Sequence, residues 1–200
     1  MLEGGCGMGQ YVICYTIKGV KVVGLDFAQK ALHRLNNRVP NLLLCAGDVS
    51  SLPFMDESFD VYYSGGVVEH FEAGATRALV EANRVLKKDS IFLVSVPYFS
   101  PLRSILLPFK KNEWKFTNKE QVDTTESTNG LRFFQYAYKT REFEKMLNNT
   151  GFKVIEKQGY AIIWGLSELP FFRSINEIKL PQRNNPMKEL RKLKFLISNN

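Results

Sequence analysis

Apolar and polar positions alternate along the first half of the chain in two recurring patterns. Short apolar runs typical of buried strands are separated by stretches in which apolar residues recur every third or fourth position, as on one helix face. The runs predict strands at residues 21–26, 42–46, 59–64 and 91–96, and the helical patterns lie at residues 10–17, 28–35 and 75–86. Strands and helices that alternate in this way indicate an α/β protein with a parallel sheet and helices on both faces.

The periodicity is lost between residue 97 and about residue 139, where prolines and asparagines mix with many aromatic residues. We expect an aromatic-rich insertion with little regular structure there. A helix then starts near Thr140, its predicted N-cap, and Gly151 follows its end. Two closing strands are predicted at residues 152–156 and 161–164, followed by a basic tail from about residue 180.

The composition, 44% hydrophobic and 24% charged over 200 residues, predicts a single domain spanning residues 1–200. No apolar stretch long enough to cross a membrane is free of proline and charge, and the first residues do not resemble a secretory signal. Three cysteines without a CxxC motif or histidine partners predict neither a disulfide framework nor a metal site. We therefore expect a cytoplasmic protein with reduced thiols.

The net charge of +7 belongs to the second half of the chain. Residues 1–100 carry 9 Lys/Arg against 10 Asp/Glu, and residues 101–200 carry 18 against 10. A basic C-terminal half can steer an acidic substrate, an anionic membrane surface or nucleic acid toward the protein, but a solvated basic face explains the same charge without a partner. We expect no more than a weak membrane-surface contact through this part, and the sequence leaves the oligomeric state open.

The strongest chemical signal is a glycine-rich segment at a strand-to-helix turn, Glu3-Gly4-Gly5-Cys6-Gly7-Met8-Gly9. Glycines at such a turn let the backbone approach a ligand at the helix N-terminus. Asp26 ends the next strand, where a carboxylate can accept hydrogen bonds from two ribose hydroxyls. Gln10 stands where a dinucleotide-binding fingerprint has its third glycine, so the spacing favours a nucleoside ligand that is not a dinucleotide.

With an acid followed by G-x-G-x-G, this segment resembles the first motif of the class I S-adenosylmethionine-dependent methyltransferases. The similarity covers about residues 2–99 and 138–164, and Leu52-Pro53-Phe54 followed by Ser58-Phe59-Asp60-Val61 is typical of the ubiquinone/menaquinone-biosynthesis-like branch (methyltransferase type 11). The resemblance implies S-adenosyl-L-methionine as the cofactor. It also implies a Rossmann-like three-layer sandwich, with a mostly parallel seven-stranded sheet whose last strand is antiparallel. Only two residues precede Glu3, so we expect a truncated first strand.

The resemblance further implies roles for individual residues. Asp26 matches the acid that binds the ribose, and Phe27 matches the residue that flanks the adenine. Asp48 and Val49 match the segment that hydrogen-bonds the adenine amino group and packs on its ring. We assign the cofactor site to these residues, to the glycine segment and to the end of the strand at 59–64, namely to Glu3, Gly5, Cys6, Gly7, Gly9, Asp26, Phe27, Asp48, Val49, Ser64 and Gly65.

Methyl transfer is an in-line displacement, so the protein mainly has to align the nucleophile, the methyl carbon and the sulfur. A hydroxyl acceptor also needs a base, and His70, shortly after the strand at 59–64, is the candidate catalytic residue. A structural or adenosine-side role for His70 is the simpler interpretation, and a metal site at Glu69 and His70 is a more remote one. Tyr98 and Phe99 follow the strand at 91–96, where such enzymes build the acceptor pocket, so we assign them to substrate binding.

Together these residues predict an S-adenosylmethionine-dependent methyltransferase that acts on an unidentified small molecule, with oxygen or carbon favoured over nitrogen as the methylated atom. Nucleic acid is not expected as the acceptor, because Ser64-Gly65-Gly66-Val67 stands where nucleic-acid enzymes carry an Asn/Asp-Pro-Pro-aromatic motif. One alternative is a truncated, non-catalytic methyltransferase-like protein. A more remote alternative is an NAD-dependent dehydrogenase, which would share the sheet and Asp26.

Overall fold

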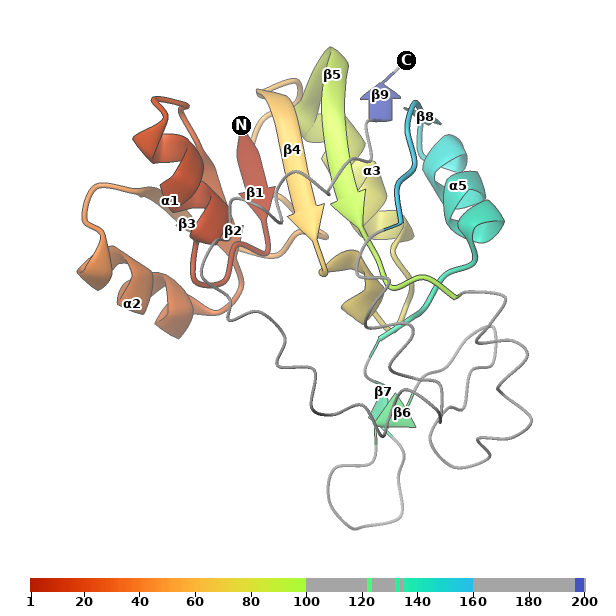
Figure 1. Cartoon of the computed structure of the whole chain (residues 1–200), viewed down its shortest axis with the longest axis horizontal. Coiled ribbons are helices and arrows are strands. Elements are labelled where there is room, and N and C mark those ends of the chain that lie inside the picture. Colours follow the sequence, from red (N-terminus) through yellow and green to blue (C-terminus); the bar gives the residue numbers. More distant parts are fainter. Residues whose placement is uncertain (100–121, 124–131, 134, 160–196, 200) are drawn as a thin grey trace, which may run out of the picture.

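The computed structural model of the chain describes residues 1–99, 122–123, 132–133, 135–159 and 197–199 (Figure 1). The main element is a seven-stranded sheet with the strand order β3-β2-β1-β4-β5-β9-β8. In chain order, the elements are β1 (Leu2–Gly4), α1 (Gln10–Ile17), β2 (Val23–Asp26), α2 (Gln29–Arg38), β3 (Leu43–Ala46), β4 (Phe59–Gly65), the 3-10 helix η1 (Val68–His70), α3 (Thr76–Val85), β5 (Leu86–Ser95), β6 (Val122–Asp123), β7 (Arg132–Phe133), α5 (Thr140–Asn149), β8 (Phe152–Val154) and β9 (Ile197–Asn199).

The sheet is parallel from β3 to β5, and β9 is antiparallel to both of its neighbours, β5 and β8. The chain moves outward from β1 through β2 to β3 and then returns to the other side of β1 with β4. The order therefore reverses beside β1, which has only three residues, all buried. This confirms the predicted Rossmann-like sheet with an antiparallel last strand.

Helices cover both faces of the sheet and bury two separate apolar clusters. The larger cluster joins α3 and α5 to one face and includes Leu79 and Phe143, which pack with strand residues such as Tyr62. The smaller cluster lies on the other face, where Val12 of α1 and Leu32 of α2 are buried. These two clusters confirm the three-layer arrangement. No helix in the described part of the chain has the length and apolar character that a membrane crossing requires.

The boundary between α3 and β5 differs from the predicted one. The helical pattern extended to Leu86, and the next strand was expected to start at residue 91. In the structure Leu86 leaves the helix with extended backbone angles (φ −83°, ψ 139°), begins β5 and pairs with Phe59 of β4. Its side chain is 1% exposed. Because Leu86 is buried as either a helix or a strand residue, the apolar spacing alone does not separate the two.

The closing part of the sheet is only partly as predicted. The expected strand at 152–156 forms as β8, but the one expected at 161–164 lies outside the described residues. The antiparallel strand between β5 and β8 is β9, from residues 197–199. The basic tail expected from about residue 180 and most of the insertion expected at 97–139 also lie outside the described residues.

Two smaller expectations concern the segment before β8. Helix α5 begins at Thr140, whose predicted role as N-cap is wrong: Lys139 is the N-cap residue, and no side chain caps the helix there. Gly151 does end the helix with a positive φ of 89°. In the described part of the insertion, β6 and β7 form an antiparallel pair of two residues each.

Candidate cofactor and acceptor site

The carboxyl ends of the parallel strands bring the predicted site residues to one edge of the sheet. The register places Gly4 beside Leu25 on β2 and beside Ser64 on β4, and it places Asp26 beside Ala46 on β3. The loops after β1, β2, β3 and β4 therefore start next to one another, at the reversal of strand order where open α/β sheets bind their ligands. In Figure 1 the arrowheads of β1, β4 and β5 point toward the side on which β6 and β7 lie.

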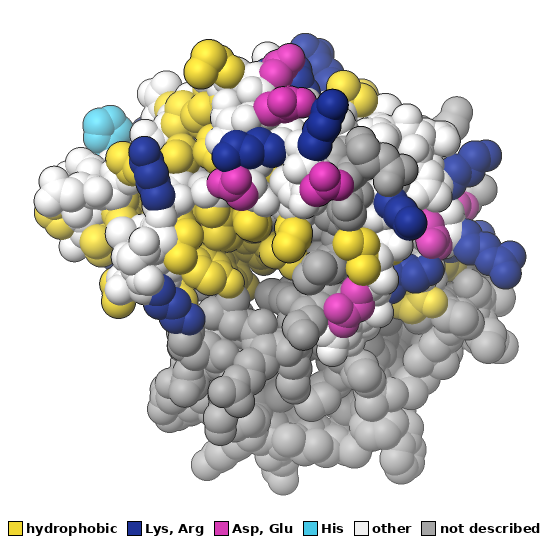
Figure 2. All heavy atoms as spheres, turned by 90° about the horizontal axis from the view of Figure 1, so that it is seen from above, with side chains coloured by type: hydrophobic (Ala, Val, Ile, Leu, Met, Phe, Trp, Pro, Cys, Tyr) yellow, Lys and Arg dark blue, Asp and Glu magenta, His cyan; other side chains and the backbone are white. Residues whose placement is uncertain are grey.

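The opposite edge of the sheet has a different character. Viewed from that side, Lys and Arg side chains are interspersed with Asp and Glu side chains over the described surface (Figure 2). A mixed distribution of charge is typical of a solvated surface and does not concentrate a potential of one sign. The described surface on this side therefore does not favour a ligand of either charge.

Three glycines with positive φ build the loop between β1 and α1. The angle is 74° at Gly5, 50° at Gly7 and 68° at Gly9, a region that residues with a side chain adopt only at a cost. A Cβ on Gly9 would run into Leu35 of α2, whereas a Cβ on Gly7 would meet no atom of the described residues within 4 Å apart from its chain neighbours. Gly9 is thus needed for packing, and Gly7 borders open space beside the N-terminus of α1, where backbone N–H groups can receive a polar ligand.

The glycine loop is fastened to β2 by its backbone. The N–H groups of Gly5 and Cys6 both donate to the carbonyl oxygen of Leu25, at 2.8 and 2.9 Å. The Cys6 side chain is buried, and burial, together with the nearby carboxylates, raises the pKa of its thiol to about 12. Cys6 therefore contributes its backbone to the loop, and its thiol stays protonated at neutral pH.

Glu3 supports the loop from below the surface. Its Oε2 accepts a hydrogen bond of 2.8 Å from the N–H of Val12, in the first turn of α1, so the carboxylate caps this helix from the neighbouring strand. Glu3 is 4% exposed. The pKa of its carboxyl is raised to about 7, mainly by burial and in smaller part by the charge of Asp26, while the hydrogen bond from Val12 opposes the shift. In the structure, Glu3, which was assigned to the cofactor site, holds α1 against β1 through this hydrogen bond.

Asp26 links the loops that follow β1 and β2. Its Oδ2 accepts a hydrogen bond from the N–H of Gly7 at 2.7 Å, and its Oδ1 accepts one from the N–H of Ala28 at 2.8 Å. Both contacts orient the carboxylate before any ligand binds. A ribose hydroxyl at this position would meet an acceptor whose orientation is already fixed.

The loops after β2 and β3 carry the residues assigned to the adenine. Phe27 is 84% exposed, and Asp48 is exposed as well. The Oδ1 atom of Asp48 accepts a hydrogen bond of 2.7 Å from the N–H of Ser50, which closes a local turn. Val49 is 5% exposed and packs in the larger core cluster. The structure therefore leaves Phe27 and Asp48 accessible to a ligand and places the Val49 side chain in the core.

The end of β4 and the η1 turn lie at the part of this edge where the base and the acceptor pocket are predicted, the acceptor side. Ser64 and Glu69 are buried, and their Oγ and Oε2 atoms have no hydrogen-bond partner within the described part of the chain. Burial raises the pKa of Glu69 above its ordinary value.

His70, the base proposed from the sequence, has an exposed side chain. Sequence reasoning missed the burial of Glu69 because a single 3-10 turn leaves no periodic signal. Gly65, assigned to the cofactor, ends β4 against the ring of Tyr63.

A segment far along the chain completes this side. Tyr98 forms a parallel bridge with Tyr138, and the N–H of Phe99 donates to the carbonyl oxygen of Tyr138 at 2.9 Å. Tyr98 is 51% exposed and Phe99 is half-buried. Among the described residues, the buried hydroxyl of Tyr138 has no partner, and burial followed by the charge of Glu69 raises its pKa. The described residues contain no group of three or more His, Cys, Asp or Glu side chains that could hold a metal ion.

The fold and this edge define a Rossmann-like α/β domain whose glycine loop and two carboxylates suit a nucleoside ligand. Residues 2–94 match a family described as a methyltransferase domain. A probable S-adenosylmethionine-dependent methyltransferase of Mycolicibacterium smegmatis is 34% identical over 117 residues, which cover 56% of this chain and 45% of that protein. The demethylmenaquinone methyltransferase of Renibacterium salmoninarum is 36% identical over 109 residues, 52% of this chain and 45% of that protein.

Among solved structures, the PH0226 protein of Pyrococcus horikoshii has the same fold, with a TM-score of 0.61 at 24% identity over 80% of this chain and 76% of that one. Over residues 2–94 the chain is thus similar to a methyltransferase domain, and its curated relatives include S-adenosylmethionine-dependent methyltransferases. The similarity supports the predicted family, and the shared architecture confirms the predicted Rossmann-like fold. The chain spans less than half the length of the two curated relatives named above.

Proposed function

We propose that the chain binds S-adenosylmethionine at the loops after β1, β2 and β3 and transfers its methyl group to a small-molecule acceptor. The observation that carries this proposal is the geometry of Gly7. Its backbone is left-handed, no described residue beyond its chain neighbours has an atom within 4 Å of the place where a Cβ would be, and its N–H donates to the carboxylate of Asp26. A ligand can therefore approach the main chain closely beside an oriented acceptor for its ribose.

The other assigned residues divide the binding task. The exposed ring of Phe27 is available to flank the base, and the carboxylate of Asp48 can accept a hydrogen bond from its amino group. When bound, the cofactor supplies a methyl group on a positively charged sulfur. Held by the glycine loop, Asp26 and Asp48, the cofactor would present that methyl group as an electrophile to an acceptor on the β4 and β5 side of the edge. The protein contributes alignment and the removal of any proton from the acceptor.

Two adjacent residues are candidates for the proton acceptor. His70 is the residue proposed from the sequence. Glu69 is supported by its burial and by an oxygen without a hydrogen-bond partner in the described part of the chain. A carboxylate with a raised pKa is a stronger base than an ordinary one, which suits proton removal near neutral pH. We propose Glu69 as the base, with His70 as the alternative.

We propose an aromatic or otherwise apolar acceptor that is methylated on oxygen or carbon. Tyr98 and Phe99 follow β5 at the same edge of the sheet as Glu69, and both present aromatic surface. The Renibacterium salmoninarum relative acts on demethylmenaquinone by its name, which supports a ring-bearing acceptor. A weak contact of the basic C-terminal part with a membrane surface stays a prediction.

The test is isothermal titration of the purified chain with S-adenosylhomocysteine, with NADH as a second ligand. We expect S-adenosylhomocysteine alone to bind, and Asp26→Asn to weaken binding by about 10- to 100-fold, because a charge-assisted hydrogen bond contributes roughly 1.5–3 kcal/mol. Lys87→Ala is the matched control, since it removes only an exposed ion pair with Asp60. Binding of NADH would favour the dehydrogenase alternative. Binding without turnover across a broad panel of acceptors would favour the non-catalytic one.

A further inference from the structure

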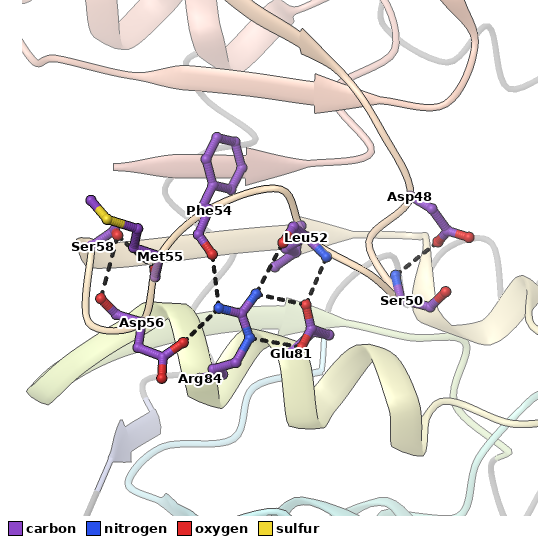
Figure 3. Close-up of polar contacts among 9 residues, drawn as sticks. All are labelled: Asp48, Ser50, Leu52, Phe54, Met55, Asp56, Ser58, Glu81 and Arg84. Atoms are coloured by element: carbon purple, nitrogen blue, oxygen red, sulfur yellow. Dashed lines mark hydrogen bonds and ion pairs between the residues drawn. The ribbon is translucent and has the colours of Figure 1, made fainter.

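Two side chains of α3, Glu81 and Arg84, form a clamp against the loop between β3 and β4 (Figure 3). The Nε and Nη2 atoms of Arg84 donate to Oε1 and Oε2 of Glu81, each at 2.8 Å. The two side chains are 30% and 18% exposed, so both are largely withdrawn from water. A two-pronged pair of this kind has a fixed relative orientation, which a single ion pair lacks.

The clamp holds the main chain of the loop. Arg84 donates from Nη2 to the carbonyl oxygen of Leu52 at 3.0 Å and from Nη1 to that of Phe54 at 2.8 Å. The N–H of Leu52 donates to Oε2 of Glu81 at 2.7 Å. Leu52 is itself buried. Three backbone groups of the loop are thus fixed to one helix by two side chains.

Asp48 lies in the loop between the end of β3 and the residues that the clamp holds. The far end of the loop is bonded to α3 by the N–H groups of Glu57 and Ser58, which donate to carbonyl oxygens at the end of the helix. The near end is the local turn of Asp48 and Ser50. Figure 3 shows Asp48 on the same loop, on the β3 side of the clamped residues. Asp48 is therefore held on one side by the end of β3, on the other side by the clamp, and locally by the N–H of Ser51 and the buried side chain of Val49.

The contacts of Arg84 are unequal in weight. Asp56 also pairs with Arg84 at 2.7 Å, but its side chain is 74% exposed, so water screens that contact. The hydrogen bonds from Arg84 hold the pKa of Glu81 below its ordinary value, so the carboxylate stays charged. Only a guanidinium supplies donors in a planar fork that can reach Glu81 and two carbonyl oxygens at once. A lysine at this position would keep the charge and lose the geometry.

We propose that Glu81 and Arg84 are a positioning pair that sets Asp48 to accept a hydrogen bond from the 6-amino group of adenine, and so determine selectivity for adenine over a 6-oxo base. The Oδ1 atom of Asp48 accepts a hydrogen bond from the N–H of Ser50, and the Asp48 side chain is exposed. A carboxylate can only accept, so a base with an oxygen at position 6 would place two acceptors together. This inference rests on the proposed cofactor site.

The experiment compares two ligands, S-adenosylhomocysteine and S-inosylhomocysteine, which differ only in an amino group or an oxygen at position 6. Isothermal titration is carried out on the wild type and on Arg84→Lys, Glu81→Gln, Asp48→Ala and the control Lys87→Ala, with a melting temperature for each. We expect the wild type to prefer the adenosyl ligand by about tenfold or more, as one good hydrogen bond allows. Asp48→Ala should reduce this ratio to near one, and Lys87→Ala should leave it unchanged.

For Arg84→Lys and Glu81→Gln we expect the ratio to fall most of the way to the Asp48→Ala value, through weaker binding of the adenosyl ligand alone. An equal loss for both ligands, or an unchanged ratio in a folded variant, would overturn the inference and leave the cofactor site intact. Glu81→Gln keeps Arg84 and gives the answer if Arg84→Lys does not fold. A wild type that binds neither ligand would instead overturn the proposed function.

Discussion

The two sides of the carboxyl-end edge treat their polar groups in opposite ways. On the cofactor side, every assigned carboxylate already has a backbone partner. Glu3 accepts from Val12, Asp26 accepts from two N–H groups, and Asp48 accepts from Ser50. This side is organised without its ligand, so little has to be ordered when the nucleoside binds.

On the acceptor side, three buried atoms have no hydrogen-bond partner within the described residues, namely Ser64 Oγ, Glu69 Oε2 and Tyr138 Oη. A buried polar atom without a partner costs about 1–3 kcal/mol. The difference indicates that the hydrogen bonds of the cofactor side contribute to the stability of the fold. The three buried atoms of the acceptor side reduce that stability and could each bond to a ligand. Four predictions test this contrast.

The largest expected effect separates two glycines of the same loop. Gly9→Ala should lower the free energy of unfolding by about 3 kcal/mol or more, because a left-handed residue with a side chain costs roughly 1–2 kcal/mol and the overlap with Leu35 adds a packing penalty. Gly7→Ala should lose only about 1 kcal/mol, since its Cβ meets open space. Urea unfolding measures both, and equal losses would contradict the distinct roles given to the two residues.

A pH series on Glu3 tests the cofactor side next. The pKa of this carboxyl is about 7 in the fold against an ordinary value of 4.5, so the protonated form is favoured by folding. The stabilisation is complete below pH 4.5 and is lost as the pH rises through 7, a change of about 3 kcal/mol. Glu3→Gln has no ionisable group at this position, so its free energy of unfolding should not fall over this pH range as that of the wild type does. The difference in unfolding free energy between the two proteins should therefore change with pH over this window; a constant difference would contradict the shifted pKa.

Glu69 and His70 can be separated by turnover with an acceptor that the wild type methylates. Glu69→Gln should lower the rate by about 100-fold, the lower end of what a positioned base contributes. His70→Ala should change it by less than about threefold, because its side chain is exposed. Both variants should bind S-adenosylhomocysteine like the wild type. The reverse order of effects would restore His70 as the base.

The smallest expected effect is a gain. Tyr138→Phe removes a buried hydroxyl that has no partner among the described residues, so it should raise the stability of the ligand-free chain by about 1 kcal/mol. The change keeps the ring packing against Phe143. Thermal unfolding measures the gain. Tyr136→Phe is the comparison: the hydroxyl of Tyr136 donates to the carbonyl oxygen of Glu72, so its removal should lower the stability. A loss of stability in Tyr138→Phe would show that its hydroxyl is satisfied.

The cofactor side could be predicted from the sequence because its signals are local. The spacing of Gly5, Gly7 and Gly9 requires a particular backbone, and Asp26 and Asp48 each end an apolar run, so both had to lie at the carboxyl edge of a parallel sheet. The hydrogen bonds within this edge could not be predicted in detail. The sequence placed Glu3 in the cofactor site but gave no sign that it caps α1.

The acceptor side was less predictable because it depends on contacts between distant segments. The burial of Glu69 arises where the segment of Tyr138 packs beside β5 and η1, and nothing in the local pattern indicates that pairing. The clamp of Glu81 and Arg84 could not be predicted for the same reason. A charged pair three residues apart on a helix is typical of a solvated face, and the sequence does not show that Arg84 reaches the carbonyl oxygen of Leu52. Residues 197–199 could not be recognised as the antiparallel strand for the same reason.

The place of β9 in the sheet has a consequence for the order in which the protein is made. Strand β8 leaves the ribosome well before residues 197–199, yet among the described residues the sheet joins it to β5 through β9. Until β9 emerges, the described contacts that hold α5 and β8 to the growing protein include the side chains of Phe143 and Phe152. The five parallel strands can thus form during synthesis, and the far edge of the sheet closes in a later, separate step.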